Sequence, residues 1–128
     1  MGDKIIFRGM LKPQELRVET EKCFIGINLL ENLGESYYRS LANKFFDYLQ
    51  CGKPSVNMNF PEYKKINDKY NCCELIENLS CESISLACKK FFSDKNYYQK
   101  MQANCVQAAQ EFCWENEEEK LKQIFFNL

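Results

Sequence analysis

The sequence predicts an α/β protein with a Rossmann-like parallel sheet and helices on both faces. Short apolar runs alternate with helical patterns over the first two thirds of the chain. The run Cys23–Leu30 has almost no polar alternation, which is typical of a strand buried on both faces. Alternating strands and helices form βαβ units with right-handed crossovers. We therefore expect about four strands in one domain spanning residues 1–128, a length at which roughly two thirds of the unfolded surface is buried.

The amino-terminal part supplies the first two expected strands. Lys4–Arg8 reads KIIFR, a short apolar strand that ends at a glycine. Pro13 is suited to the first turn of a helix, which the pattern continues to Lys22. The second strand is Cys23–Leu30, and a polar loop, Glu31–Arg39, follows it.

A central helix, strand and helix come next. Ser40 is a residue type that caps helices, and an apolar face follows it at helical spacing until Gly52 and a nearby proline end the helix. Ser55–Met58 reads as a short strand. A second helix begins at Pro61 and ends near Lys69, with Asn71 as its carboxyl-terminal cap.

The segment CCELIE is the fourth expected strand, and the remainder of the chain reads as helix only. One helix begins near Ser83, and Tyr97–Phe112 forms the next after a break at Asp94. Trp114 is expected to anchor a charged final helix. The apolar face of that helix is made of Leu121, Ile124, Phe125 and Leu128.

Composition narrows the function classes. The chain has 17 basic and 18 acidic residues and a net charge of −1, which gives no electrostatic reason to expect a nucleic acid partner. It has no histidine, so the commonest general base and metal ligand is missing. We expect no metal and no cofactor. The eight cysteines follow no secretory signal and form no Cys-x-x-Cys pair, which predicts reduced thiols in a cytoplasmic protein. No apolar run is long enough for a transmembrane segment.

Several segments together resemble the carboxyl-terminal domain of GT-B glycosyltransferases of family 4. NKFFDYLQCGKPSVNMNFPEYKKI is similar to the family's "PNK-apolar-FEY" pattern, which runs into "GKPVV" and a later "PE". IIFRGMLKPQEL is similar to a strand and glycine loop upstream of it, and CFIGINLL to the strand between them. CWENEEEKLKQIF resembles the family's tail. The resemblance extends over nearly the whole chain, and the order and spacing of the segments are its most specific feature.

The resemblance implies a nucleotide-sugar donor domain with strand order 3-2-1-4-5-6. The four strands expected here would be strands 3, 4, 5 and 6, so the chain would be a fragment or a truncated gene product without the acceptor domain. An apolar sheet edge would then be exposed, and such edges are prone to self-association. We therefore expect a homodimer through that edge.

The resemblance also implies roles for particular residues. Asp47 matches the second acid of a Glu-x7-Glu motif, which accepts hydrogen bonds from the donor ribose, a task suited to a carboxylate. The first acid would fall at Arg39. A cation in place of that acid puts catalysis at the donor sugar in doubt. From the residues alone, the alternative interpretation of Asp47 is a solvated helix acid.

The other candidate residues lie in two loops and a helix start. Ser40, Asn43 and Lys44 would form an amide-lined first turn that faces the donor diphosphate, because helix amino termini attract anions. Met10 and Leu11 would hold the base. The alternatives are helix capping and solvation for the first group and a simple β–α loop for the second. We expect Tyr37 and Tyr38 to serve in packing. We expect the acids Glu117, Glu118 and Glu119 to form a solvated face.

The implied reaction is glycosyl transfer from a nucleoside diphosphate sugar to a glycan, lipid or other acceptor, with retention of configuration. Its transition state would resemble an oxocarbenium ion, so catalysis would depend on stabilising the departing diphosphate. The chain contains no Asp-x-Asp, so no metal-held diphosphate is indicated. A second hypothesis is a non-catalytic α/β binding or interaction module, a degenerate remnant of the donor domain. A flavodoxin-like response regulator is disfavoured, because paired acids after a first strand are missing.

Overall fold

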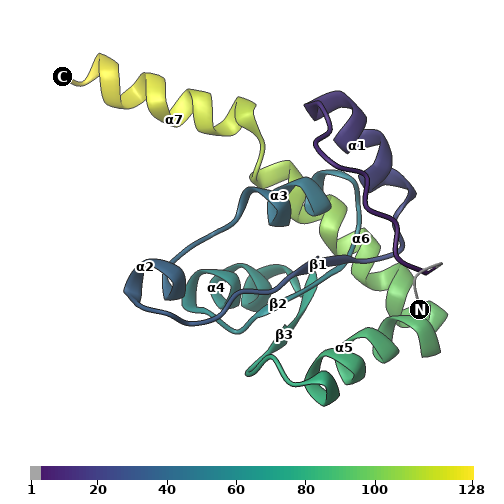
Figure 1. Cartoon of the computed structure of the whole chain (residues 1–128). Coiled ribbons are helices and arrows are strands. Elements are labelled where there is room, and N and C mark those ends of the chain that lie inside the picture. The colour runs from purple at the N-terminus through teal and green to yellow at the C-terminus, as the bar shows by residue number, and fades with distance from the viewer. Residues whose placement is uncertain (1–3) are drawn as a thin grey trace.

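A three-stranded parallel sheet forms the centre of the protein. The computed structural model describes residues 4–128 (Figure 1). The strands are β1 (Gly26–Asn28), β2 (Ser55–Met58) and β3 (Cys73–Ile76), and they lie side by side in chain order. This confirms the predicted α/β class with a parallel sheet flanked by helices.

Local sequence signals set the ends of most helices. Prolines occupy the first turns at Pro13 and Pro61, and Asn71 ends its helix in the left-handed region with φ 51°. The side chains of Ser80 and Asp94 cap the two helices that follow the sheet. In chain order, the helices are α1 (Pro13–Lys22), α2 (Glu35–Tyr38), α3 (Asn43–Gln50), α4 (Pro61–Tyr70), α5 (Cys81–Ser93), α6 (Lys95–Glu111) and α7 (Trp114–Phe126).

Helices cover both faces of the sheet. Glu74 of β3 lies opposite Val56 of β2 in register, and Lys90 of α5 binds the Glu74 carboxylate at 2.9 Å. Successive residues of a strand point to opposite faces, so Asn57 points away from α5. On that other face, Tyr63 of α4 reaches the sheet. All four residues of β2 are buried as a result.

Helix α6 lies across the amino ends of the strands. The Tyr98 hydroxyl donates to the carbonyl of Phe24, which precedes β1, at 2.6 Å. The Asn104 side chain donates to the carbonyl of Asn71, which precedes β3, at 2.9 Å. The amino ends are therefore covered, and the carboxyl ends carry the open loops.

The core lies between the sheet and these helices. Its largest fully buried side chains include Phe45, Leu49, Phe91 and Met101. Three thiols, Cys72, Cys73 and Cys105, are also buried within it, and all eight cysteines are free. They pack as small apolar groups, as expected.

The prediction of a leading strand at Lys4–Arg8 is wrong, and so is the expected number of about four strands. Residues 5–9 adopt no regular structure, and Phe7 is 91% exposed. Within residues 4–128, β1 pairs with β2 alone, so no strand lies beside the segment to complete its hydrogen bonds. A strand-like apolar pattern without a neighbouring edge does not form a strand.

Three boundaries in the middle of the chain also differ from the predictions. The strand predicted at Cys23–Leu30 is only Gly26–Asn28. It is not buried on both faces, because Ile27 is 41% exposed at the sheet edge. The loop Glu31–Arg39 contains the short helix α2. Helix α3 begins at Asn43, because Ser40 uses its hydroxyl to donate to the Tyr37 carbonyl instead of capping it.

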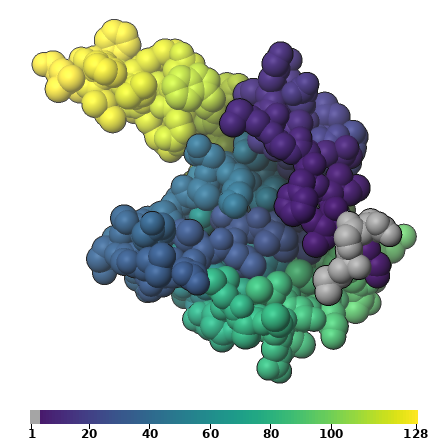
Figure 2. Space-filling view, in the orientation of Figure 1, coloured from purple at the N-terminus to yellow at the C-terminus, as the bar shows by residue number. Residues whose placement is uncertain are grey.

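Helix α7 extends away from the rest of the molecule, as Figures 1 and 2 show. No residue of this fully described helix is buried. Trp114 does not anchor it: its side chain is 66% exposed. The connection to α6 is instead held by the Asn116 amide, which donates to the carbonyls of Gln110 and Glu111.

Candidate functional site

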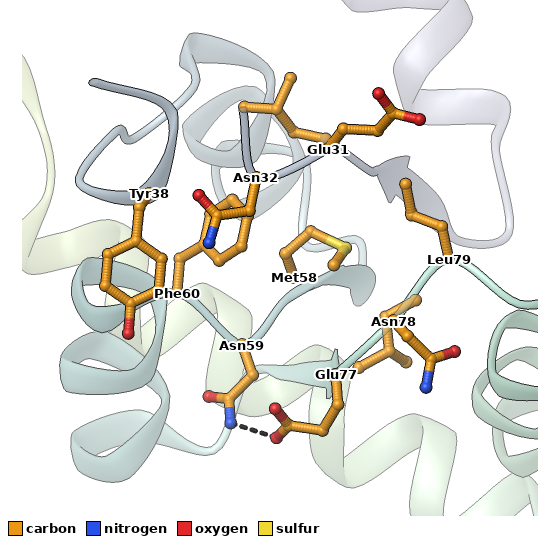
Figure 3. A pocket seen from close by; sticks show the side chains of 11 residues that line it. Glu31, Asn32, Tyr38, Met58, Asn59, Phe60, Glu77, Asn78 and Leu79 are labelled. Atoms are coloured by element: carbon orange, nitrogen blue, oxygen red, sulfur yellow. Dashed lines mark hydrogen bonds between the residues drawn. The ribbon is translucent and has the colours of Figure 1, made fainter. Parts of the chain in front are cut away.

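One cavity lies at the carboxyl ends of the strands, and we call it the tip cavity. Its volume is about 390 Å³. Loops after all three strands line it, together with Tyr38 of α2 (Figure 3). Ligands of open α/β sheets bind at this end of the strands, so its position matches the general rule. The polar lining residues are Glu31, Asn32, Asn59, Glu77 and Asn78.

Acids and amides dominate the tip cavity. The Asn59 amide nitrogen donates to a Glu77 carboxylate oxygen, while its own amide oxygen is buried without a hydrogen-bond partner. The side chains of Glu31 and Glu77 come from opposite sides in Figure 3. No lysine or arginine lines the cavity. Like charges repel, so this cavity is a poor site for a phosphate.

A second, smaller cavity lies between α1 and α3, and we call it the helix cavity. Its volume is about 240 Å³. Asp47 lines it from α3, and Pro13, Leu16 and Arg17 line it from α1. The Arg17 guanidinium pairs with Glu21 at 3.0 Å and not with Asp47. The carboxylate of Asp47 forms no ion pair within residues 4–128. Asp47 is exposed and can accept hydrogen bonds from a ligand.

The predicted diphosphate-binding turn lies at the start of α3. Asn43 and Lys44 are its first two residues, and both are exposed. No side chain caps this turn. The Ala42 amide immediately before it donates to the Tyr63 hydroxyl at 2.8 Å. The structure therefore brings Asn43, Lys44 and Asp47 onto one short helix, whereas Ser40 lies outside it.

The other predicted residues, including Asn43 and Lys44, do not line the helix cavity. Met10 is fully exposed. Leu11 is half-buried and lines a different cavity with Val18 and the side chains around it. Arg39 forms an exposed ion pair with Glu35 at 2.7 Å.

A buried polar network beneath α3 escapes the sequence analysis. The Asn28 amide donates to the Asn57 side-chain oxygen and to the Tyr63 hydroxyl, each at 3.0 Å. Asn57 in turn donates to the Ser55 hydroxyl at 2.9 Å. The network therefore links β1, β2 and α4 to the Ala42 amide that precedes α3. The sequence did contain a signal for this network: Asn28 and Asn57 lie in otherwise apolar strands, and buried amides need hydrogen-bond partners.

The largest pKa shifts belong to a tyrosine and to thiols that line neither cavity. Burial and a hydrogen bond to Glu74 raise the pKa of Tyr97. Burial also raises the pKa of the Cys105 thiol. The pKa of Cys73 is raised by the neighbouring Cys72 thiol and by burial, while the hydrogen bond between the two lowers the pKa of Cys72. Within the described chain, these thiols are buried and not poised as nucleophiles.

Within residues 4–128, no group of three or more acidic or cysteine side chains is arranged to hold a metal ion. No helix in this part of the chain is both long and apolar enough to cross a bilayer. No family model, curated protein or solved structure matches the chain.

Proposed function

We propose that the chain is the later part of the donor-binding domain of a GT-B glycosyltransferase and binds the nucleoside diphosphate of a sugar donor. One observation carries the proposal: Asp47 and the start of α1 line the same cavity. Helix α1 directly follows the loop of Met10 and Leu11, to which the resemblance assigns the base. The Asp47 carboxylate, which would accept hydrogen bonds from the ribose hydroxyls, thus lies next to α1, the helix that follows the loop expected to hold the base.

The strand order supports the same proposal. The observed order β1-β2-β3 corresponds to strands 4, 5 and 6 of the expected donor domain. In the expected order, two further strands would separate strand 4 from strand 3, which is the segment Lys4–Arg8. That segment lies outside the sheet, and the neighbouring edge exposes Ile27. Two strands added at this edge would reverse the strand order at β1 and create the crevice at which such sheets bind ligands.

The chain alone would bind a donor without transferring its sugar. The position of the first acid is occupied by Arg39, whose guanidinium is paired with Glu35. A cation there cannot stabilise the positive charge that develops on the sugar in the transition state. Reaction would be expected only from a protein that also supplies the missing strands and the acceptor domain.

Titration of the ¹⁵N-labelled chain with UDP and, separately, GDP tests the proposal. We expect chemical-shift changes at millimolar nucleotide for the amides at the start of α3 and at residues 10–12. Asp47→Asn should weaken binding about tenfold, the loss expected when a charge-assisted hydrogen bond becomes a neutral one. Asp68→Asn is the matched control, because Asp68 is an exposed helix acid on α4. Absence of binding of both nucleotides, or equal binding by both variants, would contradict the proposal.

A non-catalytic interaction module is the second candidate. The exposed apolar residues of α7 favour it, because large apolar side chains on a projecting helix indicate a surface that contacts another molecule. The nucleotide titration distinguishes the two candidate functions, because an interaction module requires no nucleotide binding at Asp47.

A further inference from the structure

Helix α7 carries an apolar stripe that nothing in the described chain covers. Trp114, Leu121 and Phe125 of α7, and Leu128 just beyond its end, are each at least 45% exposed. With Glu118 they follow one another at spacings of four and three residues, the repeat of a coiled-coil seam. An isolated helix of this length is marginal in water. The stripe therefore needs a partner.

Charge along α7 indicates what that partner is. The first half of the helix carries the acids Glu115, Glu117, Glu118 and Glu119, and the second half carries Lys120 and Lys122. Two copies of the helix in antiparallel orientation would place the acidic half of each against the basic half of the other. A parallel pair would instead place Glu118 against Glu118 in the seam.

We propose that α7 mediates an antiparallel homodimer of this chain. In an antiparallel coiled coil, the seam residues of one helix pack between those of the other. This packing brings Phe125 of each copy against Trp114 of the other. The flanking positions bring Glu115 of one copy near Lys122 of the other. Lys122 now pairs with Glu118 of its own helix at 3.1 Å, and exposed pairs of this kind are weak enough to exchange partners.

This dimer is distinct from one formed through the sheet edge and does not rest on nucleotide binding. Each α7 is about 20 Å long, so the interface is at the small end of protein interfaces, and we expect a dissociation constant on the order of 10–100 μM. A negatively charged helix start also disfavours an anionic membrane surface as the partner.

Sedimentation of the full chain between 10 and 500 μM tests the proposal. We expect a monomer–dimer equilibrium for the wild type and at least a tenfold higher dissociation constant for Leu121→Glu combined with Phe125→Glu. Phe126→Glu is the matched control, because Phe126 is 86% exposed and lies outside the stripe. A wild-type chain that stays monomeric at 500 μM, or that binds anionic vesicles without self-association, would overturn the proposal.

Crosslinking tests the orientation separately. In the antiparallel register, Glu118 of one copy lies opposite Leu121 of the other. A chain that carries both Glu118→Cys and Leu121→Cys should therefore form a reversible disulfide-linked dimer under mild oxidation, and neither substitution alone should do so. A crosslink formed by Glu118→Cys alone would show a parallel or unrelated arrangement and overturn the antiparallel assignment.

Discussion

Removing the Tyr63 hydroxyl should destabilise the protein and loosen the start of α3. Tyr63 is 3% exposed, and its oxygen accepts from the Asn28 amide at 3.0 Å and from the Ala42 backbone amide at 2.8 Å. Tyr63→Phe retains the ring, which contacts Phe45 edge to face. The substitution thus removes two hydrogen bonds and little packing.

The magnitude follows from the burial of the two donors. Asn28 is 5% exposed but retains its bond to Asn57, whereas the Ala42 amide is only partly buried. A buried donor left without a partner costs about 1–3 kcal/mol. We therefore expect Tyr63→Phe to lower the free energy of unfolding by about 2 kcal/mol, which corresponds to a fall in Tm of roughly 6–10 °C for a domain of this size.

Urea unfolding and hydrogen exchange of the Ala42 amide check this prediction. The matched control is Tyr37→Phe, because Tyr37 is 41% exposed and its hydroxyl makes no hydrogen bond within the described residues. We expect the control to stay within about 0.5 kcal/mol of the wild type. If Tyr63→Phe also stays within that range, or if Ala42 exchange does not accelerate, the network does not hold the start of α3.

Three further outcomes follow from the structure. Stability should fall as pH rises above 9, by at most about 1.4 kcal/mol per pH unit from Cys105, because the raised pKa of Cys105 keeps its thiol protonated in the fold while the unfolded chain ionises; Cys105→Ala should flatten pH-dependent urea unfolding. Gly26→Ala should cost about 2–3 kcal/mol, since its Cβ would overlap the Tyr48 ring, and much less in a Tyr48→Ala background. Thiol titration without reductant should find eight thiols in denaturant and slow reaction of Cys72 and Cys73 in the native state.

Elements defined by local chemistry are predictable from this sequence. The strand Ser55–Met58 lies where its apolar run predicts it. Pro61 starts its helix, and Asn71 adopts the left-handed conformation that ends it. Asp94 both breaks one helix and caps the next. Each of these features depends on residues within a few positions, so the sequence pattern is sufficient.

Elements defined by distant contacts are not predictable in this way. Lys4–Arg8 has a strand-like pattern, but a strand also needs a neighbouring edge, which the pattern does not report. Ser40 looks like a helix cap, yet α3 begins at Asn43, after an amide held by Tyr63 of the next helix. The stripe on α7 has helical spacing, but spacing does not reveal whether the partner belongs to the same chain.

The candidate site shows the same division. The sequence places Asn43, Lys44 and Asp47 on one helix, and the structure has them there. That Asp47 shares a cavity with Leu16 depends on how α1 packs against α3, and no local signal specifies this. The assignment of a ribose to Asp47 stays a prediction.

The two incompletely covered regions of the protein would take different kinds of partner. No strand pairs with the outer edge of β1 within residues 4–128, so further strands could be added there, although the carbonyl of Ile27 already accepts a hydrogen bond from Tyr48 at 3.1 Å. The stripe on α7 has its backbone satisfied within the helix and needs apolar side chains instead. Substitutions on α7 should therefore leave nucleotide binding unchanged, and Asp47→Asn should leave self-association unchanged. If both properties changed together, nucleotide binding and self-association would share one surface, and the separate roles assigned to Asp47 and α7 would be wrong.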